Sequence, residues 1–298
     1  MTTTDLFSGL NQSLKNKINF IEDKPEESLE STLRALWFFA AGNPKSVAGA
    51  LDFQLPELTN EQQLLLNELI DKRLENIPLA YITGRQRFMG IDFMCDKRAL
   101  IPRKETEILG RKALDLSFKL AEGKQEISVF DICCGAGNLG LSIALLNSKA
   151  IVYETDISHE AIDLTNDNIS MLDINQRVFA LQGDLFSAVE NDKFFENTDL
   201  IVCNPPYISS GKVKNMSPEI LGKEPVLAFD GGMFGTKIIQ RLIVEAPKFL
   251  RNNGWLIFEV GDGQGDFIVQ LCERAELYSK IETTVDENGI IRVISVKK

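Results

Sequence analysis

The segment Asn204-Pro205-Pro206-Tyr207 combines residue types that could bind a flat polar group. It follows the apolar run at 200–203, so a strand is expected to end there. Two consecutive prolines remove two backbone donors and restrict two φ angles, which makes the segment stiff. The Asn204 side-chain oxygen and the Pro205 carbonyl could accept the two hydrogens of a planar NH₂ group while the Tyr207 ring packs on its face. The segment therefore predicts a site that positions an amide or amino nitrogen.

Such a nitrogen is weakly nucleophilic because its lone pair is conjugated, and it is not ionised at neutral pH. A basic residue would help little, so the practical route is to position the lone pair against an electrophilic methyl group. The oxygens of Asn204 and Pro205 would also face the positive charge that develops on the nitrogen. We therefore interpret Asn204, Pro205 and Tyr207 as catalytic, and Asn204, Pro205, Pro206 and Tyr207 as the binding site of the acceptor.

A second candidate site is the glycine-rich turn at 131–140, DICCGAGNLG. Its glycines 135, 137 and 140 match G-x-G-x-x-G between an expected strand and an expected helix. Glycine lets the backbone approach a ligand, and a helix N-terminus favours negative charge. Asp156 ends the next expected strand, 19 residues after Gly137 (156 − 137), where a carboxylate could accept hydrogen bonds from ribose hydroxyls. The pattern fits a dinucleotide and a nucleoside cofactor such as S-adenosylmethionine equally well.

Alternating strand and helix patterns place these residues on one sheet. Expected strands lie at 128–133, 150–156, 178–184, 200–206 and 254–261, and expected helices at 138–147, 158–170 and 236–250. The alternation predicts a parallel sheet covered on both faces, and Asn288-Gly289 predicts a terminal hairpin that adds an antiparallel strand. Because ligands of such sheets bind at the carboxyl ends of the strands, the glycine turn, Asp156, Asp184 and Asn204 should line one crevice. A methyl transferase has a use for Asn-Pro-Pro-Tyr there, whereas a hydride-transferring enzyme has none that is evident.

The preceding part of the chain has a helical pattern. Apolar stripes at 29–42 and 59–76 predict two helices, the second opened by Thr59 and Gln62 at capping-box spacing. Residues 82–101 alternate loosely around two glycines, which predicts a β-hairpin, and a further helix is expected to begin near Glu105.

Composition and charge exclude several classes. The net charge of −11 disfavours broad nucleic-acid binding. The N-terminal residues do not resemble a secretory signal, and the apolar run at 36–41 is far too short to span a membrane. Five cysteines without a CxxC pair suggest neither a disulfide framework nor a zinc site. We expect a cytoplasmic protein with reduced thiols and without a metal.

Several motifs together resemble the HemK/PrmC family of protein-(glutamine-N5) methyltransferases. The resemblance covers roughly residues 60–298 and is carried by IPLAYITGRQRFMGIDF (77–93), LIPRKETEIL (100–109), DICCGAGN (131–138), QGDLFSA (182–188), NPPYI (204–208) and KEPVLAFDGGMFG (223–235). It implies the class I S-adenosylmethionine-dependent methyltransferase fold, a seven-stranded, mostly parallel, Rossmann-like α/β sheet with a small N-terminal helical domain. It divides the chain into a helical substrate-recognition domain (1–81), a β-hairpin linker (82–104) and a methyltransferase domain (105–298).

The resemblance also implies the ligands and their residues. S-adenosylmethionine is the methyl donor, S-adenosylhomocysteine the product, and the acceptor is the glutamine of the Gly-Gly-Gln motif in class 1 peptide chain release factors. Residues from Asn204 to Tyr207 hold that glutamine, and Asn204 also touches the cofactor. The other cofactor-binding residues are those of the loop, which holds the methionine part, Asp156 at the ribose, and two residues near the adenine: Cys133, Cys134, Gly135, Ala136, Gly137, Asp156, Asp184 and Leu185.

The sequence departs from the family pattern at four positions in or near the predicted site. Cys133 and Cys134 replace a glycine and a threonine, Lys104 a proline, and Leu185 an aromatic residue. Alternative interpretations are an adenine N6-type methyltransferase on nucleic acid, a methyltransferase for another protein glutamine such as one in a ribosomal protein, a nicotinamide-dependent oxidoreductase, and a scaffold that binds cofactor without turnover. We expect a monomer that binds no nucleic acid sequence-specifically.

Overall fold

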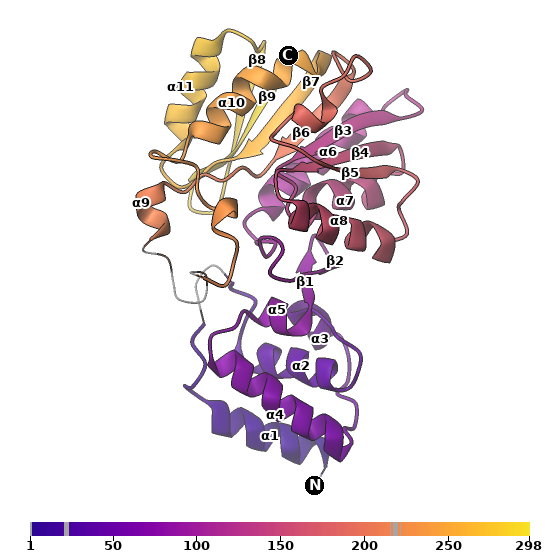
Figure 1. Ribbon diagram of the computed structural model, residues 1–298, viewed down its shortest axis with the longest axis vertical. Coiled ribbons are helices and arrows are strands. Elements are labelled where there is room, and N and C mark those ends of the chain that lie inside the picture. Colours follow the sequence, from indigo (N-terminus) through magenta and orange to yellow (C-terminus); the bar gives the residue numbers. More distant parts are fainter. Residues whose placement is uncertain (1, 21–23, 215, 217–219, 221) are drawn as a thin grey trace. The chain divides into compact units, whose positions relative to one another are not determined.

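The computed structural model describes residues 2–20, 24–214, 216, 220 and 222–298 (Figure 1). The chain forms two compact units. The first consists of residues 1–97, 101–104 and 217–224, and the second of residues 98–100, 105–216 and 225–298. The functional division of the chain at residues 81 and 104 stays a prediction.

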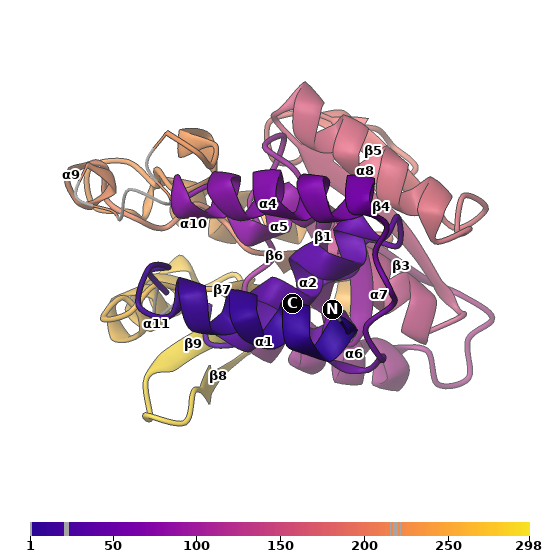
Figure 2. The same ribbon diagram turned by 90° about the horizontal axis from the view of Figure 1, so that it is seen from below.

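The first unit is helical with one hairpin. Its elements are α1 (Thr3–Leu14), α2 (Leu29–Ala40), α3 (Val47–Leu51), α4 (Asn60–Leu74), α5 (Leu79–Thr83), β1 (Arg85–Phe88) and β2 (Ile91–Met94). Helix α2 packs against the other four helices, between α1 and α4 in Figure 2. The predicted capping box of α4 is confirmed, because Thr59 and Gln62 each accept a backbone hydrogen bond from the other. The predicted hairpin is also confirmed, since β1 and β2 pair antiparallel.

The second unit is a doubly covered α/β sheet, as predicted. Its strands are β3 (Ile127–Ile132), β4 (Ala150–Asp156), β5 (Val178–Gln182), β6 (Thr198–Cys203), β7 (Leu250–Glu259), β8 (Lys280–Val285) and β9 (Ile291–Lys297). Among the described residues they form one seven-stranded sheet in the order β5-β4-β3-β6-β7-β9-β8. Strands β3 to β7 are parallel, and β9 runs antiparallel to both of its neighbours.

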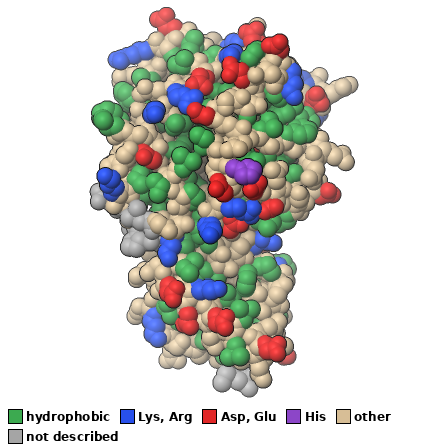
Figure 3. Space-filling view, in the orientation of Figure 1, with side chains coloured by type: hydrophobic (Ala, Val, Ile, Leu, Met, Phe, Trp, Pro, Cys, Tyr) green, Lys and Arg blue, Asp and Glu red, His purple; other side chains and the backbone are tan. Residues whose placement is uncertain are grey.

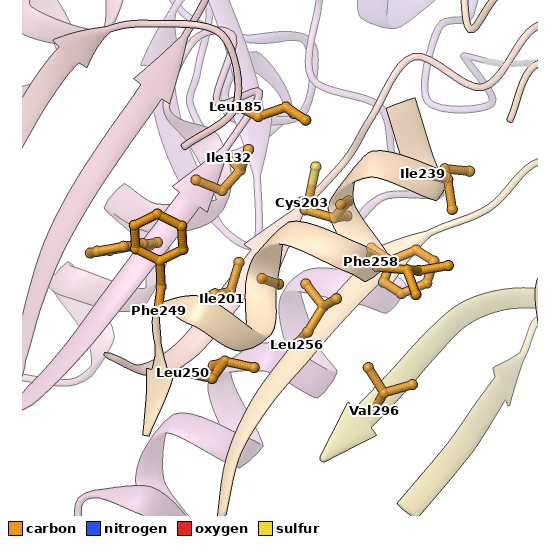
Figure 4. Packing of buried hydrophobic residues seen from close by; sticks show 14 of the residues in the cluster. Ile132, Leu185, Ile201, Cys203, Ile239, Phe249, Leu250, Leu256, Phe258 and Val296 are labelled. Carbon is orange, nitrogen blue, oxygen red and sulfur yellow. The ribbon is translucent and has the colours of Figure 1, made fainter. Parts of the chain in front are cut away.

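Helices cover both faces of this sheet (Figure 1). They are α6 (Glu107–Leu120), α7 (Asn138–Leu146) and α8 (His159–Met171) on one face and α10 (Lys237–Glu245) and α11 (Gly265–Ala275) on the other, with the short α9 (Ser210–Val213) in a connection. Figure 4 shows the core beneath α10, where Ile132, Cys203 and Phe258 pack together and are fully buried. Burial of each large apolar side chain contributes about 1.5–3 kcal/mol. This core fixes where β3, β6 and β7 end, and therefore where the residues that follow them lie.

Two helices of the second unit differ from the prediction. The helix expected over 236–250 ends at Glu245, and a 3₁₀ turn over Ala246–Lys248 replaces its last part, because Pro247 cannot donate the next helical hydrogen bond. The expected helices did not include α11.

The terminal hairpin has a longer turn than a two-residue Asn-Gly loop. Asp286 N–H donates to Ile290 O, so the loop spans the residues from one to the other. The Asp286 carboxylate accepts the N–H groups of Asn288 and Ile290, while Gly289 adopts φ +78°. The aspartate therefore selects a wider turn in which only the glycine is left-handed.

Candidate active site

The predicted site residues follow the carboxyl ends of four neighbouring strands. The loop from Cys133 follows β3, Asp156 ends β4, Asp184 follows β5 and Asn204 follows β6. These strands are parallel and adjacent in the order β5-β4-β3-β6, so their carboxyl ends share one edge. The sheet therefore brings these residues to one edge, as the sequence predicts.

The loop 133–137 is held by its own turn and by α8. Cys134 O accepts Gly137 N–H at 2.9 Å, and Thr165 and Asn168 of α8 donate to the carbonyls of Gly135 and Ala136 at 2.9 and 3.0 Å. Gly135 and Gly137 adopt φ +58° and +79°, and a Cβ on Gly135 would meet nothing within 4 Å. The backbone at Gly135 thus faces open space that a ligand can approach. Thr165 and Asn168 were not among the predicted residues.

Cys133 and Cys134 occupy different environments. Cys133 adopts φ +60°, a conformation that favours glycine, and its side chain packs on the core that contains Cys203. Burial raises the pKa of Cys203 well above its usual value, and the neighbouring Cys133 thiol adds to that rise. Cys134 is buried, its thiol lies 3.7 Å from Thr165 Oγ1, and burial raises its pKa well above the usual value.

The Asp156 carboxylate is anchored to the loop. Its Oδ2 accepts Gly135 N–H and its Oδ1 accepts Ser158 N–H, both at 2.9 Å. Burial raises its pKa, and these backbone donors oppose that rise. The Asp156 carboxylate is therefore oriented before any ligand binds. This suits a residue that accepts hydrogen bonds from the hydroxyl groups of a ligand.

Below the loop lies a buried carboxyl pair that the sequence analysis did not single out. Asp131 and Glu154 are paired in register on β3 and β4, and both are 0% exposed. Asp131 Oδ2 accepts Gly140 N–H at 2.8 Å. Burial raises the pKa of Asp131 to about 7 and that of Glu154 well above its usual range, and the neighbouring Asp131 carboxyl adds to the rise at Glu154. The two carboxyls therefore resist ionising together.

Asp184 and Leu185 differ in exposure. The Asp184 side chain is 51% exposed, and both of its oxygens accept Arg241 Nη1 at 2.9 Å. Leu185 adopts φ +51° and its side chain is buried in the core, while its carbonyl accepts the Thr155 hydroxyl at 3.1 Å. Only Asp184 of these two side chains is accessible to a ligand, and Arg241 was not predicted.

The segment Asn204–Tyr207 is held by two side-chain contacts. Asn204 Nδ2 donates to Thr106 Oγ1 at 3.2 Å, just before α6 begins. The Tyr207 hydroxyl donates to Glu259 Oε1 at 2.9 Å. Burial raises the pKa of Glu259 to about 6, and the Thr106 and Tyr207 hydroxyls oppose that rise. Within the described part of the chain, Glu259 Oε2 has no hydrogen-bond partner.

The backbone of this segment also packs against a glycine-rich loop. A Cβ on Gly231 would lie 2.6 Å from Pro206 O, and one on Gly235 would lie 2.1 Å from Tyr207 O. Gln264 donates from Nε2 to Tyr207 O at 2.9 Å and accepts Gly261 N–H at 2.9 Å. The loop 231–235 and Gln264, which follows β7, therefore fix the geometry of the Asn-Pro-Pro-Tyr segment in addition to its prolines.

Other side chains that could take part in catalysis or metal binding lie away from these residues. The single histidine of the sequence, His159, begins α8 at the surface beside Asp163 (Figure 3). Among the described residues, no three or more His, Cys, Asp and Glu side chains are grouped so that they could hold a metal ion. No described helix is both long and apolar enough to cross a membrane.

Comparisons of the fold and of a sequence model agree on the class of domain. Residues 113–234 match the methyltransferase small domain. The human methyltransferase 10 domain containing protein aligns with a TM-score of 0.51 and 15% identity, over 77% of this chain and 96% of its own. The hMettl16 catalytic domain in complex with a MAT2A 3′UTR hairpin aligns with a TM-score of 0.52 and 15% identity, over 77% and 90%. At this identity they show the fold alone, which is that of class I methyltransferases.

Curated relatives are more similar in sequence, and all three described here are named release factor glutamine methyltransferase. The Bacillus cereus protein is 33% identical over 238 residues, 80% of this chain and 82% of its own. The proteins of Thermodesulfovibrio yellowstonii and Geobacter sulfurreducens are 32% and 31% identical, over 82% and 90% of this chain and 84% and 90% of their own. With this identity over four fifths or more of its length, the chain belongs to the family of release factor glutamine methyltransferases.

Proposed function

We propose that this protein transfers a methyl group from S-adenosylmethionine to the side-chain amide nitrogen, N5, of the glutamine in the Gly-Gly-Gln motif of class 1 peptide chain release factors. The observation that carries the proposal is the sequence identity to curated release factor glutamine methyltransferases along most of the chain. The placement of Asn-Pro-Pro-Tyr directly after β6, beside the glycine loop after β3, supports it.

The residues of the cofactor side suit a nucleoside with a charged amino-acid tail. The loop from Cys133 to Gly137 would hold the methionine part, with open space above Gly135 for its approach. The preoriented Asp156 carboxylate would accept the ribose hydroxyls, and Asp184 with Leu185 would lie near the adenine. When bound, S-adenosylmethionine supplies an electrophilic methyl group on a sulfonium.

The acceptor side works by orientation. The Asn204 side-chain oxygen and the Pro205 carbonyl would accept the two N–H groups of the glutamine amide, and the Tyr207 ring would pack on its flat face. These contacts would direct the nitrogen lone pair at the methyl group. The same oxygens would stabilise the positive charge that develops on nitrogen, an electrostatic effect that is often the largest in such sites. The proton is then released from a nitrogen that has become acidic, so no dedicated base is needed.

Partners and location follow from this acceptor. A class 1 release factor would be the protein substrate and the cytoplasm the place of the reaction, with the protein acting as a monomer. The names of the relatives do not favour the alternative of an adenine methyltransferase on nucleic acid, and the net charge of −11 opposes it. A gel-shift assay at physiological salt should accordingly show no retained nucleic acid.

The direct test is transfer of a labelled methyl group. The purified protein is incubated with labelled S-adenosylmethionine and candidate release factors, and the modified residue is mapped by mass spectrometry. We expect one methyl group on the glutamine of Gly-Gly-Gln and none on a factor in which that glutamine is replaced by glutamate. The Asn204→Ala enzyme should lose transfer while cofactor binding stays measurable by calorimetry. Label on another protein, or undiminished activity of Asn204→Ala, would refute the assignment.

A further inference from the structure

The chain that follows β7 contacts Tyr207 at three points. The Tyr207 hydroxyl donates to Glu259 Oε1 at 2.9 Å, and the Tyr207 carbonyl oxygen accepts a hydrogen bond from Gln264 Nε2 at 2.9 Å. Between these two residues in the sequence, a Cβ on Gly261 would lie 2.9 Å from Tyr207 Cδ2, so the edge of the ring lies against the Gly261 backbone. The hydroxyl, the ring edge and the main chain of one tyrosine are therefore all held by residues 259–264.

The turn 261–264 is closed by two hydrogen bonds of its own. Gln264 N–H donates to Gly261 O at 3.1 Å, and Gly261 N–H donates to Gln264 Oε1 at 2.9 Å. Because Oε1 faces a donor there, the amide nitrogen is the atom that faces the carbonyl oxygen of Tyr207. Both polar atoms of the Gln264 amide thus have complementary partners, and its orientation follows from these hydrogen bonds.

Strand β9 anchors the turn. Val260 N–H donates to Arg292 O at 2.9 Å, and a Cβ on Gly265 would lie 2.5 Å from Ile291 Cβ. Val260 and Gly265 are both buried. The close approach to β9 leaves the turn little room to move, so it can hold the tyrosine at a fixed position relative to the sheet.

We propose that Gly261 and Gln264 are positioning residues for the methyl acceptor, an inference that rests on the proposed function. In that function the Tyr207 ring packs on the flat face of the acceptor amide. Gln264 fixes the main chain that carries the ring. Gly261 has no side chain, so the ring edge can lie close to its backbone while the ring hydroxyl reaches Glu259. The plane of the ring is thus set before the acceptor binds, and Gly261 and Gln264 act through Tyr207 rather than by touching the acceptor.

Replacement of Gln264 by glutamate tests the contact with the main chain. Gln264→Glu keeps the shape of the side chain and an acceptor for Gly261 N–H, but an oxygen then faces the Tyr207 carbonyl in place of the donor. We expect kcat for a release factor to fall by about 10- to 100-fold, while KM and the cofactor affinity measured by calorimetry change little. An unchanged kcat, whatever happens to KM, would overturn the proposal.

Replacement of Gly261 by alanine tests the contact with the ring. Gly261 does not adopt a positive φ, so alanine adds no backbone strain there, and the new Cβ must displace the Tyr207 ring edge and Gln264 Oε1, each 2.9 Å away. Because the required shift is small, we expect kcat to fall by about 10-fold. Gly289→Ala is the control, since its Cβ would meet nothing within 4 Å, and it should keep the wild-type rate. Equal rates for the two alanine variants would refute the role of Gly261.

A further measurement needs no acceptor. In protein labelled with carbon-13 tyrosine and nitrogen-15 isoleucine, the Ile208 amide reports the chemical shift of the Tyr207 carbonyl carbon, and Tyr207→Phe identifies the signal. This shift should change in Gln264→Glu, because a hydrogen bond to the carbonyl is lost, and should stay the same in Gly289→Ala. If it does not change in Gln264→Glu, the contact is refuted whether or not a release factor is methylated. If it changes while the wild type methylates no release factor, the contact is supported and only the assigned acceptor fails.

Discussion

Replacement of Gly235 by alanine should slow methyl transfer although this residue lies outside the Asn-Pro-Pro-Tyr segment. The new Cβ would lie 2.1 Å from the Tyr207 carbonyl oxygen and 2.8 Å from Gln264 Nε2. Since Cβ contacts shorter than 3.0 Å essentially never occur, the Tyr207 carbonyl and residue 235 must move apart by about 3.0 − 2.1 = 0.9 Å, and we expect part of this shift at Tyr207. A displacement of about 1 Å at a reacting centre can lower the rate by about 100-fold.

The substitution also strains the backbone, and a matched control separates the two effects. Gly235 adopts φ +70°, where alanine costs about 1 kcal/mol. Gly289 in the terminal hairpin adopts φ +78°, and a Cβ there would meet nothing within 4 Å. Gly289→Ala should therefore lose only the stability that corresponds to the backbone strain and keep the wild-type rate.

The assay is the initial rate of methyl transfer to a release factor at saturating cofactor, with thermal unfolding of both variants measured in parallel. We expect kcat of Gly235→Ala to fall by about 100-fold while its cofactor affinity is unchanged, because Gly235 makes its close approach to Tyr207 rather than to the loop 133–137. If Gly235→Ala and Gly289→Ala transfer methyl groups at the same rate, the packing of the loop 231–235 against Tyr207 does not position the acceptor, and the reasoning fails.

Three further predictions concern stability. Gly140→Ala would place a Cβ 2.2 Å from Glu154 Oε1 and 2.8 Å from Val152 Cγ1 and should cost about 1–3 kcal/mol in chemical denaturation, a cost that should fall in a Glu154→Ala background but not vanish, because the contact with Val152 remains. The pKa of Asp131 is raised from 3.8 to about 7 in the folded protein, so its stabilising contribution should decline as the pH rises across that interval, and Asp131→Asn should flatten this dependence of Tm on pH. Asp199 is fully buried and paired with Lys124 and Arg251, so Asp199→Ala should lower the free energy of unfolding by about 3 kcal/mol, and a change under 1 kcal/mol would contradict the assigned ion pairs.

The sheet was predictable because its strands carry unambiguous patterns. Strand β4 occupies Ala150–Asp156, the range that the sequence predicts, since the apolar run Ala150–Tyr153 is typical of a buried parallel strand. The location of Asp156 and Asn204 at one edge followed from the parallel order of the strands alone. These features depend on residues close together in the sequence.

The contacts that orient the site depend on residues far apart in the sequence, so no local pattern reveals them. Thr106 and Asn204 are 98 residues apart, and Tyr207 and Glu259 are 52 apart. The role of Gly235 depends on a close approach that only coordinates can show. The wide turn of the last hairpin depends on the Asp286 side chain, which accepts the backbone N–H groups of Asn288 and Ile290. The Asn-Gly pattern alone does not show this contact.

The strand order divides the sheet at the boundary between β3 and β6. The cofactor side of the proposed site follows β3, β4 and β5, whereas the acceptor side follows β6 and is supported by β7. Under the proposed function, the two halves of the reaction are thus built on separate groups of strands that meet along one line. Under this division, changes in the connections after β6 and β7 should alter how the acceptor amide is held, while the loops after β4 and β5 stay unchanged.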